Sequence, residues 1–160
     1  MIAGDEDAGM SRRVRIFDGL DAKEIDVIRA MLRSHEYGPN EVIYKEGEEG
    51  DSLNIIEKGK VRINKLMVAG DQFCIATLKE GDIFGIMSFL DGSAHDATIV
   101  SGQQTRLTVF RRADFDRLLV SNPLVACKVL RQLAIHLASI VRNMNSQYID
   151  LMHLMFRKSR

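Results

Sequence analysis

The chain has 160 residues, 46% of them hydrophobic, and its 22 basic residues balance 22 acidic ones. This length suits one domain with a single core, and a formal net charge of zero lacks the basic excess that a general nucleic-acid-binding surface needs. No uninterrupted apolar run reaches the roughly 18 residues of a membrane span, and the N-terminus lacks the apolar stretch of a signal peptide. Cys74 and Cys127 have no metal-type spacing and are interpreted as buried small side chains in a reducing compartment. We therefore expect a cytoplasmic protein that does not associate with a membrane.

The N-terminal part combines an aperiodic tail with a predicted helix. Residues 1–14 are acidic and contain glycine, so we expect this tail to be poorly ordered. Asp21 followed by Glu24 has the spacing of a capping box, and apolar residues then recur every three or four positions as far as Leu32. The sequence therefore predicts a helix that begins after Asp21 and ends before the Gly and Pro of residues 37–40.

Residues 41–111 have a different texture, with short β-rich runs separated by turn signals about every eight to twelve residues. No helical period is present in this block, so a compact β-barrel or β-roll is expected. The predicted strands are Val42–Tyr44, Ser52–Glu57, Lys60–Met67, Gln72–Leu78, Asp82–Phe84, Ala97–Ser101 and Thr105–Phe110.

The helical period returns near the C-terminus. Residues 113–120 predict a short helix, and Asn122 with Pro123 has the composition of a new helix start. No Pro or Gly follows, so one helix from Pro123 to about Phe156 would be roughly 50 Å long. The expected divisions are a tail at 1–14, a β-roll domain at 15–122 and a long helix at 123–160.

This last helix carries apolar residues at alternating spacings of three and four, which is the pattern of a coiled-coil seam with one polar interruption at Gln147. The first half is expected to lie on its own domain, whereas an overhanging apolar stripe needs a partner. We therefore predict a homodimer built from parallel copies of this helix. The predicted dimerisation residues are Leu130, Leu133, Leu137, Ile140, Met144, Leu151 and Leu154.

The stretch from 81 to 99 holds the candidate binding site. A strand ends at Phe84, Gly85 permits a sharp turn, residues 86–90 predict one short helical turn, and the chain returns to a strand after residues 91–93. Such a unit directs free backbone N–H groups at one place, which suits a phosphate. On these residues alone, a plain helical corner in a β-barrel is an equally good interpretation.

Three motifs in order make the pattern more specific: residues 47–63 read GEEGDSLNIIEKGKVRI, residues 81–85 read GDIFG, and residues 95–99 read HDATI. Together they resemble the cyclic-nucleotide-binding domain family, which includes the catabolite activator protein, protein kinase A regulatory subunits and cyclic-nucleotide-gated channels. The likeness covers about residues 15–145. It implies an α+β fold, in which a jelly-roll-like β-roll (a double-stranded β-helix) is flanked by an N-terminal helix and the long C-terminal dimerisation helix.

The resemblance also implies that a ligand lies against residues 84–98, the family's phosphate-binding cassette. Two positions depart from the family pattern: Ile86 stands where the family has the Glu that holds the ribose, and His95 stands where it has the Arg that clamps the cyclic phosphate. The ligand-contact residues expected from the resemblance are Phe84, Gly85, Ile86, Met87, Ser88, His95, Asp96, Ala97 and Thr98.

These departures weaken a cyclic nucleotide on physical grounds. Ile86 accepts no hydrogen bond, which costs about 1–3 kcal/mol for a desolvated hydroxyl. His95 has at most two donors and is only partly charged near neutral pH, so the loss of a charge-assisted bond costs about 1.5–3 kcal/mol more. The sum predicts binding roughly 10²–10⁴-fold weaker. His95 is interpreted either as a pH-sensitive ligand contact or as a loop residue paired with Asp96 or water.

Two functions therefore remain open, and in neither is a cofactor certain. The first is a regulatory module with weak or no cAMP or cGMP binding, which senses a cyclic nucleotide or a different small anion. The second is a ligand-free dimerisation or docking domain with a vestigial pocket and a protein partner. No catalytic constellation or metal-ligand spacing is apparent, so neither an enzyme nor a metal site is expected. Transcription factors of the family place a DNA-binding helix-turn-helix after the long helix, and the sequence ends at Arg160, so no direct DNA binding is expected.

Overall fold

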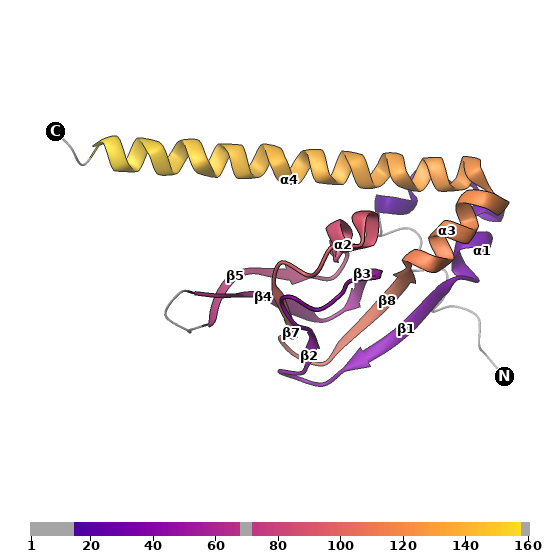
Figure 1. The fold of residues 1–160 in the computed structure, drawn as a ribbon, viewed down its shortest axis with the longest axis horizontal. Coiled ribbons are helices and arrows are strands. Elements are labelled where there is room, and N and C mark those ends of the chain that lie inside the picture. The colour runs from indigo at the N-terminus through magenta and orange to yellow at the C-terminus, as the bar shows by residue number, and fades with distance from the viewer. Residues whose placement is uncertain (1–14, 68–71, 158–160) are drawn as a thin grey trace.

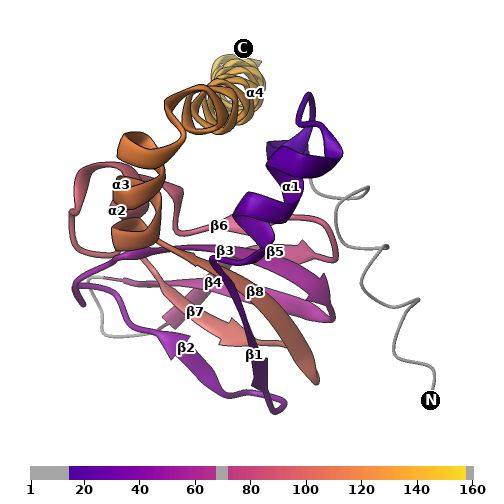
Figure 2. The same ribbon diagram turned by 90° about the vertical axis from the view of Figure 1, so that its right-hand side faces the viewer.

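The computed structural model describes residues 15–67 and 72–157, so the predicted tail at 1–14 lies outside the described residues. Two four-stranded antiparallel sheets, ordered β1-β8-β3-β6 and β2-β7-β4-β5, form the predicted β-roll, and helices cover one side of it (Figures 1 and 2). The helices are the 3-10 helix η2 (Arg15–Phe17), α1 (Ala22–Arg29), α2 (Ile86–Asp91), α3 (Arg112–Ser121) and α4 (Pro123–Arg157). The strands are β1 (Leu32–Tyr37), β2 (Val42–Tyr44), β3 (Ser52–Lys58), β4 (Lys60–Leu66), β5 (Gln72–Lys79), β6 (Ile83–Phe84), β7 (Thr98–Ser101) and β8 (Thr105–Arg111).

The first helix is shorter than its sequence pattern predicts. Asp21 and Glu24 form the expected capping box, but α1 ends at Arg29 and Leu32 begins strand β1. The prediction that the helix extends through Leu32 to the Gly-Pro turn was wrong. Strand β1 pairs with β8 along its whole length, from Leu32 opposite Phe110, and this pairing covers an edge of β8 that would otherwise be open. Tertiary pairing here outweighs the local helical period.

The apolar core has two parts, which lie on opposite faces of the sheet β1-β8-β3-β6. Inside the roll, side chains of both sheets meet, for example Ile56 of β3 and Ile99 of β7. On the other face, Leu53 of β3 packs against the helices, and Phe89 of α2 contacts the ring of Phe110 with centroids 5.7 Å apart. The helices are therefore attached to the roll by a continuous apolar layer.

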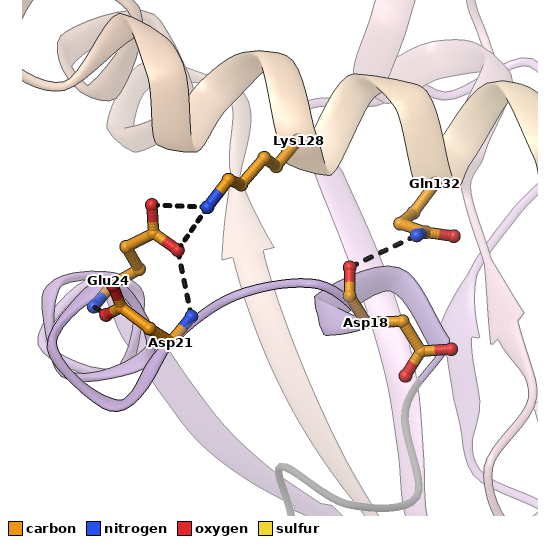
Figure 3. Close-up of polar contacts among 5 residues, drawn as sticks. All are labelled: Asp18, Asp21, Glu24, Lys128 and Gln132. Atoms are coloured by element: carbon orange, nitrogen blue, oxygen red, sulfur yellow. Dashed lines mark hydrogen bonds and ion pairs between the residues drawn. The ribbon is translucent and has the colours of Figure 1, made fainter.

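Polar contacts fasten the N-terminal helices to the start of α4 (Figure 3). Lys128 Nζ lies 2.7 Å from both carboxylate oxygens of Glu24, and this contact is the main reason that the pKa of Glu24 is lowered. Glu24 also accepts a 2.9 Å hydrogen bond from the backbone N–H of Asp21, while Gln132 Nε2 donates to the carbonyl oxygen of Asp18 at 3.1 Å. Both η2 and α1 are thus tied to the first half of α4.

The two halves of α4 have different surroundings. In the first half, Leu133 is only 1% exposed and belongs to the core, and Leu130 and Leu137 are partly buried against that core. These three predicted dimerisation residues therefore pack on their own chain, as expected for the first half of the helix. In the second half, which extends past α2 in Figure 1, Met144 is 61% exposed. The predicted seam residues that remain exposed are Ile140, Met144, Leu151 and Leu154.

One window of α4 is strongly apolar, and both cysteines are more exposed than expected. An 18-residue window of α4 has a mean hydropathy of 1.6, so its length and composition alone would allow it to cross a membrane. Cys74 and Cys127 are exposed, and the prediction that they are buried was wrong. Cys74 lies on β5, the edge strand of its sheet, and Cys127 follows the buried Ala126 on a helix, where the next residue turns away from the core.

Truncation of Leu133 tests whether the first half of α4 is part of the domain core. We expect Leu133→Ala to lower the free energy of unfolding by about 2–5 kcal/mol, because it leaves a cavity among packed side chains. Leu124→Ala is the matched control: Leu124 is on the same helix and 77% exposed, so its loss should change stability by no more than about 0.5 kcal/mol. Urea denaturation measures both, and equal effects of the two variants would contradict the assignment.

Candidate functional site

The candidate site is the unit β6–α2–β7, which lies directly on strand β3. Gly85 adopts a φ of +80°, and a Cβ atom added to it would lie 2.6 Å from the carbonyl oxygen of Ser52. Only glycine combines this left-handed conformation with so close an approach to a neighbouring backbone. The turn therefore presses the start of α2 onto the roll, as the sequence predicts.

Three successive residues of α2 have different surroundings. Ile86 is 6% exposed and belongs to the same apolar cluster as Phe89, so its side chain is part of the core. Met87 is 53% exposed, whereas Ser88 is buried. Of these three, Ser88 is the residue whose polar side chain is held within the site.

His95 is enclosed by its neighbours. The residue is only 7% exposed, and its ring stacks on that of Tyr44 with centroids 3.5 Å apart and ring planes 8° apart. Its Nδ1 atom lies 3.2 Å from Ser88 Oγ, within hydrogen-bond distance. On a third side, a Cβ atom added to Gly50 would lie 2.6 Å from His95 Cε1 and 2.2 Å from Ser88 Cβ. Tyr44, Gly50, Ser88 and His95 therefore form one closely packed group, which we call the histidine clamp.

Backbone hydrogen bonds hold the loop of His95 in place. The N–H of Gly47 donates to the carbonyl oxygen of His95, and the N–H of His95 donates to that of Glu48, both at 2.8 Å. An isolated β-bridge between Glu49 and Ala94 continues this pairing. The hairpin after β2 and the loop before β7 are therefore fastened together on both sides of the imidazole.

A second set of polar contacts fixes Asp96 and Thr98. Lys65 Nζ donates to the carbonyl oxygen of Asp96 and forms an ion pair with Glu46, 2.7 Å from Oε1. Lys65 is also the main cause of the lowered pKa of Glu46. The backbone N–H of Glu46 donates to Thr98 Oγ1 at 3.0 Å. Thr98 and the backbone of Asp96 thus have structural partners within the chain.

The pKa of His95 is lowered, because burial disfavours the charged ring more than the nearby carboxylates of Glu48, Asp51 and Asp96 favour it. Burial thus favours the neutral form of the imidazole. Its direct contacts are with Ser88 and Tyr44, and Asp96 acts on it only through charge. This geometry supports the interpretation of His95 as an enclosed loop residue, whose partners are Ser88 and Tyr44 in place of the expected Asp96.

The sequence analysis missed Tyr44 and Gly50. Tyr44 ends a predicted strand, where an aromatic residue is ordinary, and Gly50 lies in a hairpin turn, where glycine is equally ordinary. Neither residue carries a signal in the sequence that separates a packing role around His95 from a routine structural one.

A cavity of about 400 Å³ lies on the face of the sheet β2-β7-β4-β5 that points away from the interior of the roll. Thr98 and Val100 line it and alternate along β7 with Ile99, whose side chain faces the interior of the roll. Thr98, a predicted ligand contact, therefore faces away from the histidine clamp. Among the described residues, no group of three or more His, Cys, Asp or Glu side chains is placed to hold a metal ion.

Comparison with known proteins gives a consistent result. The family described as "Cyclic nucleotide-binding domain" matches residues 34–122. A cyclic AMP receptor protein from Thermus thermophilus is 29% identical over 91% of this chain and 64% of its own length. The human cyclic nucleotide-gated channel beta-1 is 32% identical over 83% of this chain but only 11% of the channel. The chain thus spans less than two thirds of these relatives.

Solved structures have the same fold. A cyclic nucleotide-binding domain from Methylobacillus flagellatus superposes with a TM-score of 0.78 at 25% identity, covering 86% of this chain and 77% of that one. The catabolite activator protein of Thermus thermophilus gives a TM-score of 0.74 at 29% identity, covering 86% and 62%. The predicted β-roll with its long C-terminal helix is confirmed by both.

The buried imidazole predicts a pH dependence of stability. Because the folded state lowers the pKa of His95 below its ordinary value of 6.5, the unfolded chain binds more protons just below that pH. Stability should therefore fall as pH decreases from about 7 to 5, and His95→Gln should reduce this loss. His136, whose pKa is also lowered by burial, contributes in the same direction, so His136→Gln is a parallel control. Urea denaturation at each pH checks the difference, and identical slopes for the unmodified protein and His95→Gln would exclude a buried neutral ring.

Proposed function

Because this chain belongs to the cyclic-nucleotide-binding domain family, we propose that it is a non-enzymatic ligand-sensing module that binds cAMP and cGMP weakly or not at all. This proposal rests on the surroundings of Ile86 and His95, the two cassette residues that depart from the family pattern. Ile86 is packed in the core and offers no hydrogen-bond acceptor, and His95 is a buried ring with its own partners, whose pKa is lowered by burial.

The proposed pocket offers little charge to a phosphate. A charge-assisted hydrogen bond contributes about 1.5–3 kcal/mol, and burial disfavours the charged form of the His95 imidazole that such a bond would need. A small ligand with less negative charge would lose less from this arrangement. No certain cofactor follows, and a different small anion would have to rely on the backbone N–H groups at the start of α2.

The core supplies a route by which such a pocket could act on the rest of the chain. Ile86 and Phe89 of α2 belong to the same apolar cluster as Val129 and Leu133 of α4. A displacement of α2 by a ligand would therefore change the packing under α4. Packed interfaces of this kind shift between discrete arrangements more readily than they deform, which suits a regulatory role.

We further propose that the exposed half of α4 forms a homodimer contact and that the protein works in the cytoplasm. Support for the dimer comes from the exposed apolar residues Ile140, Met144, Leu151 and Leu154, which keep the spacing of a coiled-coil seam. The expectation that the protein does not bind DNA gains no support from the comparison, since one relative is a "CRP-like cAMP-activated global transcriptional regulator" of Mycobacterium tuberculosis.

The second candidate function is a ligand-free dimerisation or docking domain. The tight packing of the histidine clamp favours it, because a site whose side chains are satisfied by one another has less need of a ligand. The two candidates differ in one measurable respect: a sensing module gains stability when its ligand is added, whereas a docking domain does not. A thermal-shift screen of cyclic and linear nucleotides separates them.

Calorimetric titration with cAMP at pH 7.5 tests the weak-binding proposal. We expect no binding tighter than micromolar, because neither the ribose acceptor nor the charged phosphate clamp is present. A family member that binds cAMP, titrated in the same buffer, is the positive control. A sub-micromolar dissociation constant for the unmodified chain would refute the proposal.

Charge substitutions in the exposed half of α4 test the dimer. Met144→Glu combined with Leu151→Glu places like charges in the seam, so we expect sedimentation to change from dimer to monomer without loss of folding. Val120→Glu, at an exposed apolar residue of α3, is the matched control and should remain dimeric. If the unmodified protein already sediments as a monomer at about 50 μM, where even weak dimers are populated, the dimer proposal is wrong.

A further inference from the structure

Tyr44 connects the interior of the roll to the cassette. It is half-buried, packs against the inner apolar cluster, and its ring lies 5.9 Å from that of Phe84. Tyr44 also ends β2, where it is paired with Ile99 of the central strand β7. A ring held at so many points has little freedom to turn aside.

The same ring fixes His95. The two rings are nearly parallel with centroids 3.5 Å apart, so Tyr44 covers one face of the imidazole. Ser88 Oγ lies within hydrogen-bond distance of the Nδ1 atom of the same ring. His95 can leave this position only if the stack and the contact with Ser88 are both broken. While the clamp is closed, the buried hydroxyl of Ser88 already has a partner and is not free for a ligand.

We propose that Tyr44 is the specificity-determining residue that excludes anionic ligands from the cassette, by holding His95 against Ser88. The inference rests on the proposed function, because it takes the cassette as the ligand site. Tyr44 is a positioning residue here, since it acts through His95. A ligand phosphate must open the histidine clamp before it reaches α2. An uncharged ligand that does not contact α2 need not open the clamp.

The test replaces the ring by an aliphatic side chain and uses cAMP as the anionic probe and adenosine as the uncharged one. Tyr44→Ile keeps a residue suited to a strand but removes the stack. We expect it to bind cAMP about three- to tenfold more tightly than the unmodified protein, which is the contribution of one aromatic pair, with adenosine affinity unchanged. Nuclear magnetic resonance titration should also show the pKa of His95 moving up towards its ordinary value as the ring becomes hydrated.

Two controls separate the stack from a general loss of packing. Tyr44→Phe retains the ring and should behave as the unmodified protein, and Tyr37→Ile removes another tyrosine that packs on the same cluster and should leave both readouts unchanged. In a His95→Ala background, Tyr44→Ile should alter cAMP affinity less than about twofold, because the residue through which it acts is gone. Thermal melting confirms that each variant is folded.

The outcomes are distinct. If Tyr44→Ile changes neither cAMP affinity nor the titration of His95, or if no variant binds cAMP up to about 1 mM, the inference is wrong and the proposed weak binding stands. An equal effect of Tyr44→Ile with and without the His95 ring also overturns it. Tight cAMP binding by the unmodified protein would instead refute the proposed function.

Discussion

The apolar layer between the sheet β1-β8-β3-β6 and the helices is the constraint on which the other features depend. Phe89 of α2, Phe110 of β8 and Phe115 of α3 meet there with centroid separations of 5.3 to 5.9 Å. Because α4 packs on the same layer, α2 of the cassette and the long helix contact one apolar cluster. The position of Ile86 follows from this layer, because its side chain is a component of the core.

Much of the fold could be predicted because its local signals agree with one another. The glycines at 81 and 85, the capping box at Asp21 and the uninterrupted run after Pro123 each specify one local conformation. The strand β1 could not be predicted in this way. Its first residue, Leu32, continues the apolar period of α1, and only the open edge of β8, a partner about seventy residues away, decides in favour of a strand.

The candidate site was predictable in position but not in its contacts. The motifs place His95 and Ser88 in the cassette, yet the partner of the imidazole is Tyr44, half the domain away in sequence. Stacking between side chains of separate strands depends on the register and closure of the roll, which no local pattern encodes. The lowered pKa of His95 could not be predicted for a related reason, since it is caused by burial, and burial is a property of the assembled fold.

The division of α4 into an anchored and a free half has a mechanical consequence. The free part, beyond Leu137 as far as Arg157, is about 30 Å long at 1.5 Å per residue. A tilt of about 10° at its anchored base would move its tip by roughly 5 Å, the height of one helical turn. A small change in packing beneath Leu133 would therefore produce a larger displacement at the exposed tip of α4 than at its anchored base. The ion pair between Glu24 and Lys128 lies in the anchored part of α4, where it ties the helix to α1.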